Sequence, residues 1–339
     1  MLVLGIESTC DEASAAIVEN GRIIHSNIIA SQSKLHQRFN GVYPEYASRK
    51  HVEILLPVIQ KALAKAGAAP KDLDLIAVAQ KPGLIGSLLV GMNTAKSLSM
   101  AWNIPYISVN HIQAHIYAAM MDCDPPKFPA LGVVISGGHT ILFKMWGIDE
   151  YEKLSSTIDD SIGEAFDKAA TILGLPYPGG PEIEKLAEDG DISVFPMQPC
   201  KIKNNPLAFS FSGLKTKILY LAKGLNANKH SPLIIGEKEK KHLAASFQHA
   251  ALSDIVEKSL QACKISGFQH IYLGGGVTNN KYLRTLFEQK SPSTIAIHHP
   301  PPGLSLDNGA MIAGLGYHLF QKNPQSDPYD MEVVPTGGI

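Results

Sequence analysis

The sequence predicts an α/β protein built from two related lobes. Strands alternate with helical segments along most of the chain, which is typical of a mixed α/β architecture. A unit of strand, short polar or glycine turn, and strand opens each half, first at 2–18 and again at 131–146. The two copies share layout rather than letters, and such a repeat indicates duplicated structure. A cleft between two such lobes is the usual place for a ligand.

The first half is expected to begin with a hairpin and to continue with alternating helices and strands. Asn20-Gly21, after the apolar run 13–18, is a strong hairpin-turn signal. Residues 45–66 have helical periodicity, and Pro57 is expected to kink or bend that helix. The remaining segments are the strand LDLIAVAQ, the glycine-rich turn KPGLIGS, a helix over 87–101 and the strand YISVN.

The second half follows a clear boundary, DPPKFP at 124–129. Its opening strands are LGVVIS and TILFKMW, and its later helices are IGEAFDKAATILGL, HLAASFQHAALSDIVEKSLQAC and NNKYLRTLFEQ. We therefore divide the chain into an N-terminal lobe (1–126), a C-terminal lobe (127–323) and a tail (324–339). The last helix, from about residue 307, is expected to pack across onto the N-terminal lobe.

The composition excludes several classes of protein. The chain has 339 residues, 45% of them hydrophobic, with a net charge of −1, so it can bury a large core without a global field favouring nucleic acid or membrane. No segment approaches the ~20 apolar residues of a membrane span, and the N-terminus reads as a strand rather than a signal peptide. The four cysteines form no CxxC pair, which argues against a disulfide framework. We expect a soluble, cytoplasmic protein without a membrane partner.

The segment VNHIQAH indicates a metal site. His111 and His115 are four residues apart, which places them on one face of a helix within reach of a single ion. Asp307, just ahead of a helix, is either an N-cap or the carboxylate that completes a set of two histidines and one carboxylate. That set suits iron or zinc rather than magnesium. Ile112 stands where an H-E-x-x-H peptidase has its glutamate base, so a protease is not expected.

Glycine turns indicate a nucleotide-sized site. SGGH (136–139), PYPGGPE (176–182) and GGGVTNN (274–280) provide backbone N–H groups that can approach a phosphate closely. None of them matches the P-loop or the dinucleotide fingerprint. Asp167 lies among apolar neighbours of a predicted helix, which favours a purpose such as a hydrogen bond to a ribose hydroxyl.

Two charged features have open interpretations. Asp11 and Glu12 lie in the polar turn ESTCDE, which joins the first two predicted strands. They are either solvated turn residues or functional carboxylates. Between Lys201 and Lys241 there are nine lysines against two glutamates. This lysine-rich stretch is either a solvated face or a surface that contacts a phosphate backbone.

Several unusual segments occur in one order along the chain. They are GIESTCDEAS, GVYPEYASRKH, KPGLIGSLLVG, NHIQAH, ISGGHT, GEAFDKAATILGLPYPGGP, FSFSGLKT, GGGVTNN and DNGAM. In combination they resemble the tRNA N6-adenosine threonylcarbamoyltransferase family of the bacterial TsaD type, once described as glycoprotein endopeptidases. The resemblance runs from about residue 1 to about 320, and Thr9-Cys10 departs mildly from the Ser-Cys of many members. It implies the two-lobed fold of the actin and sugar-kinase superfamily.

The resemblance also implies a reaction and a metal. A threonylcarbamoyl group would move from threonylcarbamoyl-AMP to N6 of adenosine 37 in tRNAs that read codons beginning with A. His111, His115 and Asp307 match the metal ligands of the family. They would hold one divalent ion per subunit, Fe²⁺ in first place and Zn²⁺ as the alternative, which polarises the carbamoyl group.

Substrate contacts and partners follow from the same resemblance. The nucleotide contacts carry over to Val134, Ile135, Ser136, Gly137, Gly138, Asp167, Gly180, Glu184 and Asn280. Asp11 and Glu12 match acidic residues that are candidates for orienting the reacting group. The partners implied are tRNA, a TsaB-type paralogue that forms a heterodimer, and a TsaE-type ATPase, while a TsaC-type synthase makes the adenylate. The alternatives are a metal-independent small-molecule kinase and a nucleotide-dependent scaffold of the same superfamily.

Overall fold

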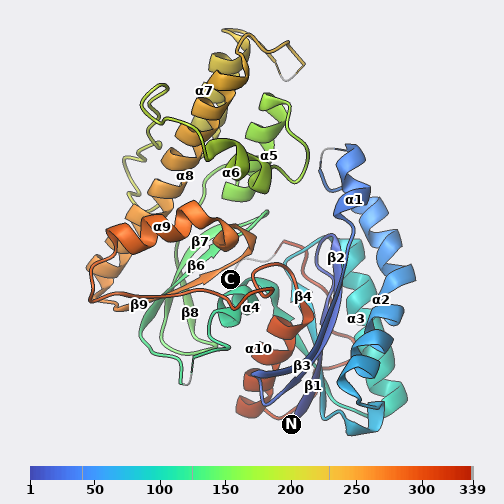
Figure 1. Ribbon diagram of the computed structural model, residues 1–339. Helices are drawn as coiled ribbons and strands as arrows, with labels where there is room; N and C mark the ends of the chain where they lie inside the picture. The colour runs from blue at the N-terminus through green and yellow to red at the C-terminus, as the bar shows by residue number, and fades with distance from the viewer. Residues whose placement is uncertain (40, 124, 229, 337–339) are drawn as a thin grey trace.

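The first of two sheets is formed by the N-terminal part of the chain. The computed structural model describes residues 1–39, 41–123, 125–228 and 230–336. Within them, five strands form a sheet in the order β3-β2-β1-β4-β5 (Figure 1). Its strands are β1 (Leu2–Glu7), β2 (Glu12–Glu19), β3 (Ile23–Ser31), β4 (Leu75–Lys81) and β5 (Tyr106–Asn110). The β1–β2 and β2–β3 pairs are antiparallel, whereas β4 runs parallel to both β1 and β5.

The second sheet repeats the first. It has the order β10-β9-β6-β7-β8, with β6–β7 and β7–β8 antiparallel and β6–β9 and β9–β10 parallel. Its strands are β6 (Ala130–Ile135), β7 (Thr140–Met145), β8 (Tyr151–Ser156), β9 (His270–Gly274) and β10 (Ala296–His298). Strand order and strand direction both match those of the first sheet, so the duplicated architecture predicted from the sequence is confirmed.

The helices of the described residues are α1 (Ser33–His36), α2 (Pro44–Ala66), α3 (Ile85–Trp102), α4 (His111–Ala118), α5 (Ile162–Leu173), α6 (Gly179–Ala187), α7 (Ser212–Lys223), α8 (Glu237–Ser266), α9 (Lys281–Lys290) and α10 (Gly309–Lys322), with short 3₁₀ turns at Gln37–Phe39, Pro70–Asp72 and Gly276–Asn279. Most helices lie at the positions that periodicity predicts, whereas α1, α6 and α7 were not predicted. Helix α2 continues through Pro57 without a break. The hairpin turn is confirmed as well, because Asn20 and Gly21 have φ angles of 50° and 76° between β2 and β3.

Helix α4 lies where the two sheets meet. It follows β5 directly, and the side chain of Asn110 caps it by accepting hydrogen bonds from the N–H groups of Ile112 (2.9 Å) and Gln113 (3.3 Å). On its other side, α4 contacts β6 and β9 of the second sheet. A Cβ atom at Gly274 of β9 would lie 2.5 Å from the carbonyl oxygen of His115, so only glycine permits this approach.

Helix α10 returns the chain from the second sheet to the first. It packs against β1, β2 and β4. The N–H of Gly309 donates to Ser14 Oγ at 2.8 Å, and a Cβ atom at Gly5 would lie 2.1 Å from the carbonyl oxygen of Gly309. The start of α10 is therefore fixed against strands β1 and β2. The exact lobe boundaries at 126 and 323 stay a prediction.

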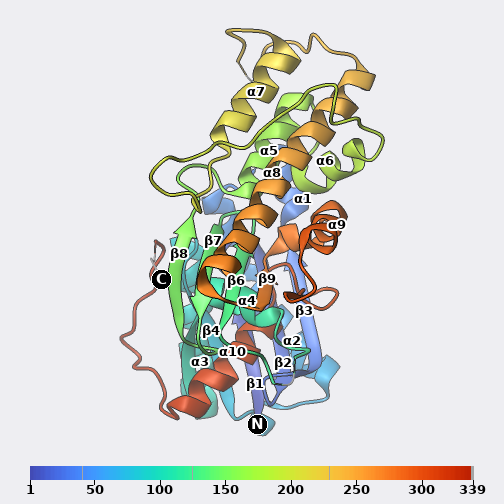
Figure 2. The same ribbon diagram turned by 90° about the vertical axis from the view of Figure 1, so that its left-hand side faces the viewer.

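The segment after α10 runs along the edge strand β5. The N–H of Asp327 donates to the carbonyl of Tyr106 (2.9 Å), and the rings of Tyr106 and Tyr329 stack with centroids 5.6 Å apart. The carbonyl of Pro335 accepts from the N–H of Gly83 at 3.1 Å, in the loop before α3. Figure 2 shows this segment passing along one side of the molecule. We name residues 323–336 the C-terminal strap.

Candidate metal and nucleotide site

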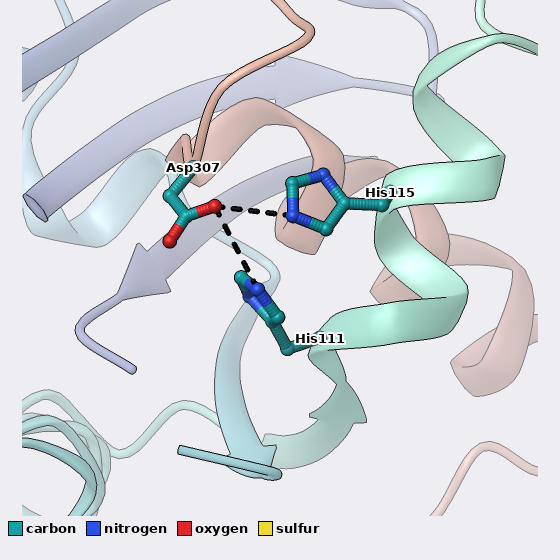
Figure 3. Close-up of side chains that lie close together, drawn as sticks. All are labelled: His111, His115 and Asp307. Atoms are coloured by element: carbon teal, nitrogen blue, oxygen red, sulfur yellow. Dashed lines mark ion pairs between the residues drawn. The ribbon is translucent and has the colours of Figure 1, made fainter. Parts of the chain in front are cut away.

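Three predicted ligands converge at the junction of the lobes (Figure 3). His111 and His115 come from successive turns of α4, and Asp307 comes from the loop that precedes α10. Asp307 Oδ1 lies 3.1 Å from His115 Nε2 and 3.7 Å from His111 Nε2. One potential ligand atom from each residue lies within 4.8 Å of the others. The spacing of the two histidines and the placement of the carboxylate thus produce one cluster.

Asp307 is not the cap of the helix that follows it. The cap is Asn308, whose side chain accepts a hydrogen bond from the N–H of Met311 at 3.0 Å. The N-cap interpretation of Asp307 is therefore wrong by one residue. Its carboxylate, 19% exposed, is turned to the histidines instead.

The cluster fits a divalent cation. Both ring nitrogens of His115 are buried, and neither makes a hydrogen bond to a described residue, although Nε2 lies close to Asp307 Oδ1. A buried polar atom without a partner costs about 1–3 kcal/mol. Two imidazole nitrogens and a carboxylate oxygen that face a common point are a donor set for Fe²⁺ or Zn²⁺.

Charges within the cluster are strongly coupled. Burial disfavours the charged form of His111, but the carboxylates of Glu7 and Asp307 outweigh burial and raise its pKa to about 9. Burial opposes ionisation of Asp307, yet His111 and His115 hold the pKa of its carboxyl well below its usual range. Burial and the two neighbouring histidines lower the pKa of His139 to about 4. The metal-free cluster therefore contains an imidazolium beside a carboxylate.

A cleft of about 1420 Å³ opens beside the cluster. Most predicted site residues line it: Asp11, Glu12, His111, Ser136, Gly137, Gly138, Asp167, Gly180, Glu184, Asn280 and Asp307. Val134 and Ile135 do not, because their side chains are fully buried in β6, and His115, which is 1% exposed, does not line it either. A contact between Val134 or Ile135 and a ligand would have to come from the backbone.

The first glycine turn is held rigidly at the start of α5. The N–H of Gly163 donates to the carbonyl of Ser136 at 3.2 Å, and Ser161 Oγ donates to the carbonyl of Gly137. A Cβ atom at Gly137 or Gly138 would meet no atom within 4 Å. The backbone of this turn thus borders open space in the cleft.

Two predicted nucleotide residues tie helices together, and a third caps one of these helices. Asp167 of α5 accepts from the N–H of Gly179 at the start of α6 (2.7 Å), and burial raises its pKa to about 6. Glu184 of α6 accepts from the N–H of Lys281 in α9 (2.7 Å). Asn280 caps α9. These contacts join α5, α6 and α9 into one wall of the cleft.

Glu12 is not a solvated turn residue. Its carboxyl accepts a hydrogen bond from Ser31 Oγ at 3.0 Å. Burial, followed by the negative charges of Asp307 and Asp11, raises its pKa to about 9. Glu12 is therefore protonated at neutral pH in the metal-free protein.

Sequence reasoning missed Glu7 and the lining residues His139 and Tyr177. Glu7 is fully buried at the end of β1, and its Oε2 lies 2.9 Å from His111 Nδ1. The available signal was an acidic residue that closes the apolar run LVLGI, where burial of a charge is costly.

The lysine-rich stretch is less cationic than its composition suggests. Lys215 pairs with Asp160 (3.0 Å), Lys240 with Glu237 (2.6 Å) and Lys241 with Asp189 (2.8 Å). The lysines exposed to solvent are Lys201, Lys203, Lys217 and Lys238, and Lys229 lies outside the described residues.

Among the helices that the structure describes, none is long and apolar enough to cross a membrane.

The duplicated sheets and the cleft between them define a two-lobed α/β protein with one five-stranded sheet in each lobe. Two solved structures show this fold. A full-length HypF shares 14% identity with a TM-score of 0.60 over 96% of this chain and 56% of its own. The component A of (R)-2-hydroxyglutaryl-CoA dehydratase from Acidaminococcus fermentans shares 13% identity with a TM-score of 0.53 over 96% and 100%. At these identities the likeness concerns the fold alone.

The sequence itself identifies the family. Residues 23–314 match the profile of TsaD, tRNA N6-adenosine threonylcarbamoyltransferase, and the chain belongs to this family of tRNA-modifying transferases. A protein of that description from Protochlamydia amoebophila is 53% identical over 98% of this chain and 97% of its own length. Another from Symbiobacterium thermophilum is 45% identical over 100% and 97%.

Proposed function

We propose that this protein transfers a threonylcarbamoyl group from threonylcarbamoyl-AMP to N6 of adenosine 37 in tRNAs that read codons beginning with A. One observation carries the proposal: His111, His115 and Asp307 converge beside a cleft lined by glycine turns. Family membership supports the tRNA modification, whereas the donor and the metal role are our inference. The reaction would take place in the cytoplasm.

The nucleotide half of the donor would lie against the wall formed by the second sheet and its helices. The N–H groups of Gly137 and Gly138, two residues that line the cleft, would suit a phosphate, whereas the N–H of Ser136 already donates to the carbonyl of His139 at 2.9 Å. Asp167 is ionised above a pH of about 6 and can then accept hydrogen bonds from ribose hydroxyls. Gly180, Glu184 and Asn280 border the same wall and would complete the nucleotide contacts.

The other half of the donor would face the histidine cluster. His111 Nε2, His115 Nε2 and Asp307 Oδ1 would hold one Fe²⁺ or Zn²⁺ per subunit, which when bound supplies Lewis-acid polarisation of the carbamoyl carbonyl. Asp11 and Glu12 lie in the same cleft and would orient the amine of adenosine.

The tRNA would be guided by the exposed part of the lysine-rich stretch. Lys201, Lys203 and Lys238 are exposed and form no ion pair with the described residues. Changing all three to glutamate should weaken tRNA binding and flatten its salt dependence, because fewer counterions are released. Binding of the adenylate should not change. An unaltered salt slope would assign these lysines to an ordinary solvated face.

A TsaB-type paralogue would dock on the outer helices of the first sheet. Val52 and Leu56, one turn apart on α2, are 66% and 49% exposed, and Ile85 and Leu89, one turn apart on the adjacent α3, are 60% and 44% exposed. Such an apolar surface is typical of a protein interface. Val52→Asp should therefore abolish co-elution with the paralogue. The TsaE-type ATPase would join the assembled pair.

Complementation tests the proposed function. Cells depleted of their own enzyme would receive this protein, His111→Ala, or His25→Ala as a control, since His25 contacts Glu19 on the surface away from the cleft. We expect threonylcarbamoyladenosine in bulk tRNA with the first and third proteins only, measured by nucleoside mass spectrometry. Full restoration by His111→Ala would refute the metal role. Failure of all three soluble proteins would reopen the kinase and scaffold alternatives.

A further inference from the structure

Glu7 is a fully buried carboxylate that contacts His111 at the ring nitrogen that does not face Asp307. Its side chain is 0% exposed at the end of β1. Oε1 accepts a hydrogen bond from the N–H of Thr9 at 2.6 Å, and Oε2 lies 2.9 Å from His111 Nδ1. A buried carboxylate costs several kcal/mol unless it is paired, so both oxygens need these contacts.

The contact determines which nitrogen of His111 carries a proton. An ionised carboxylate only accepts hydrogen bonds, so Nδ1 must be the donor. Thr9 Oγ1 lies 3.3 Å from the same nitrogen and can accept as well. In the neutral ring, Nε2 then carries the lone pair, and this is the atom that faces Asp307 at 3.7 Å.

His115 shows that this arrangement is specific to one ligand. Its Nδ1 is buried and makes no hydrogen bond to a described residue. The side of His115 that faces away from the cluster therefore lacks the carboxylate that His111 has. Of the two imidazoles, His111 has its tautomer imposed by the protein.

We propose that Glu7 is a positioning residue of the metal site. It holds His111 in the Nδ1–H tautomer, with Nε2 directed at the ion, and increases the basicity of that nitrogen. This inference rests on the metal assignment made under the proposed function. It adds a residue, 104 positions from His111, that is not one of the three candidate ligands and does not line the cleft.

Glutamine at this position separates positioning from structural support. Glu7→Gln keeps the volume of the side chain and one acceptor oxygen. If that oxygen serves Thr9 N–H, the amide NH₂ faces His111 Nδ1 and favours the Nε2–H tautomer, which cannot bind an ion through Nε2. If the amide is turned round, His111 keeps its partner but the N–H of Thr9 loses its acceptor, so the two roles cannot both be retained.

Metal affinity is the first measurement. The full chain, stripped with EDTA, would be titrated with Zn²⁺ in competition with a chromophoric chelator. We expect Glu7→Gln to bind Zn²⁺ about 10–100-fold more weakly than the unaltered protein. The control is Asp254→Asn, which neutralises another buried carboxylate, paired with Lys258 at 2.7 Å on α8. This control should leave the affinity unchanged, and melting of the metal-free proteins would show that each is folded.

The tautomer itself is the second measurement and needs no Glu7 variant. ¹⁵N spectra of the histidine-labelled protein with Zn²⁺ should show His111 protonated at Nδ1, with its signals identified by their loss in His111→Gln. A folded Glu7→Gln with full Zn²⁺ affinity, or a proton on Nε2 of His111, would overturn the inference. An unaltered protein that takes up no Zn²⁺ would overturn the metal assignment together with it. If Glu7→Gln does not fold, the spectra decide alone.

Discussion

Replacing Glu12 by glutamine should stabilise the metal-free protein, and the gain should grow with pH. Burial, Asp307 and Asp11 raise the pKa of Glu12 from 4.5 to about 9. In the unfolded chain this carboxyl group is ionised above pH 4.5, but in the folded protein it stays protonated up to a pH of about 9. Folding therefore takes up a proton in this window. The contribution of Glu12 is most favourable below the unfolded pKa and becomes a penalty as pH rises.

The size of the effect follows from the two pKa values. At pH 7 the penalty is the difference 7 − 4.5 multiplied by about 1.36 kcal/mol, which is on the order of 3 kcal/mol. By the same arithmetic the penalty is below about 1 kcal/mol at pH 5 and on the order of 5 kcal/mol at pH 8. Glutamine has nearly the same shape and no charge, so Glu12→Gln should recover most of this free energy.

Urea unfolding in EDTA at pH 5, 7 and 8 would measure the effect. The difference in the free energy of unfolding between Glu12→Gln and the unaltered protein should rise by about 1.4 kcal/mol per pH unit. Glu53→Gln is a suitable control, because that carboxylate is 66% exposed on α2. Parallel pH profiles for Glu12→Gln and the unaltered protein would refute the reasoning, since they would mean that Glu12 is ionised in the folded state.

Further predictions concern the ligands, the nucleotide wall and the packing that supports them. Asp307→Ala should weaken Zn²⁺ binding at least ~100-fold, because it removes the only anionic member of the ligand set. Parallel titrations should show that AMP binding is not weakened. Adenosine, which lacks the titrating phosphate of AMP, should bind more weakly as pH falls through about 6, where Asp167 becomes protonated. Asp167→Asn should bind adenosine about tenfold more weakly with no such dependence in calorimetry. Gly309→Ala should lower the free energy of unfolding by at least about 1–3 kcal/mol in urea, because its Cβ would lie 2.6 Å from the N atom of Ala16. Truncation after Asn323 should lower the melting temperature by about 5 °C, because the C-terminal strap bonds to β5 and to the loop before α3.

Local sequence patterns predicted most helices and strands, and they predicted that two of the three candidate ligands, His111 and His115, lie together. The helix expected over 87–101 is found as α3, Ile85–Trp102. It could be predicted because its periodicity and the glycine turn before it are both local signals. The convergence of His111 and His115 also needed only the helical repeat. The duplicated layout could be recognised because each half begins with the same order of strand, turn and strand.

Contacts between distant segments could not be derived in this way. Glu7 and His111 are 104 positions apart, and no periodicity relates them. The choice between cap and ligand at Asp307 depends on Asn308, an equally good capping residue one position later. The protonation of Glu12 depends on burial and on Asp307, which approaches it only after α10 has packed on the first sheet.

The fold divides the site between its two sheets. All three candidate ligands are anchored to the first sheet: His111 and His115 through the direct continuation of β5 into α4, and Asp307 through the packing of Gly309 on Gly5. The wall of the cleft that we propose binds the nucleotide belongs to the second sheet, through the β6–β7 turn and helices α5, α6 and α9. A donor bound to both the ligands and this wall would therefore contact both lobes. Because α4 also contacts β9 where Gly274 meets His115, the helix that carries two of the candidate ligands packs directly on the second sheet.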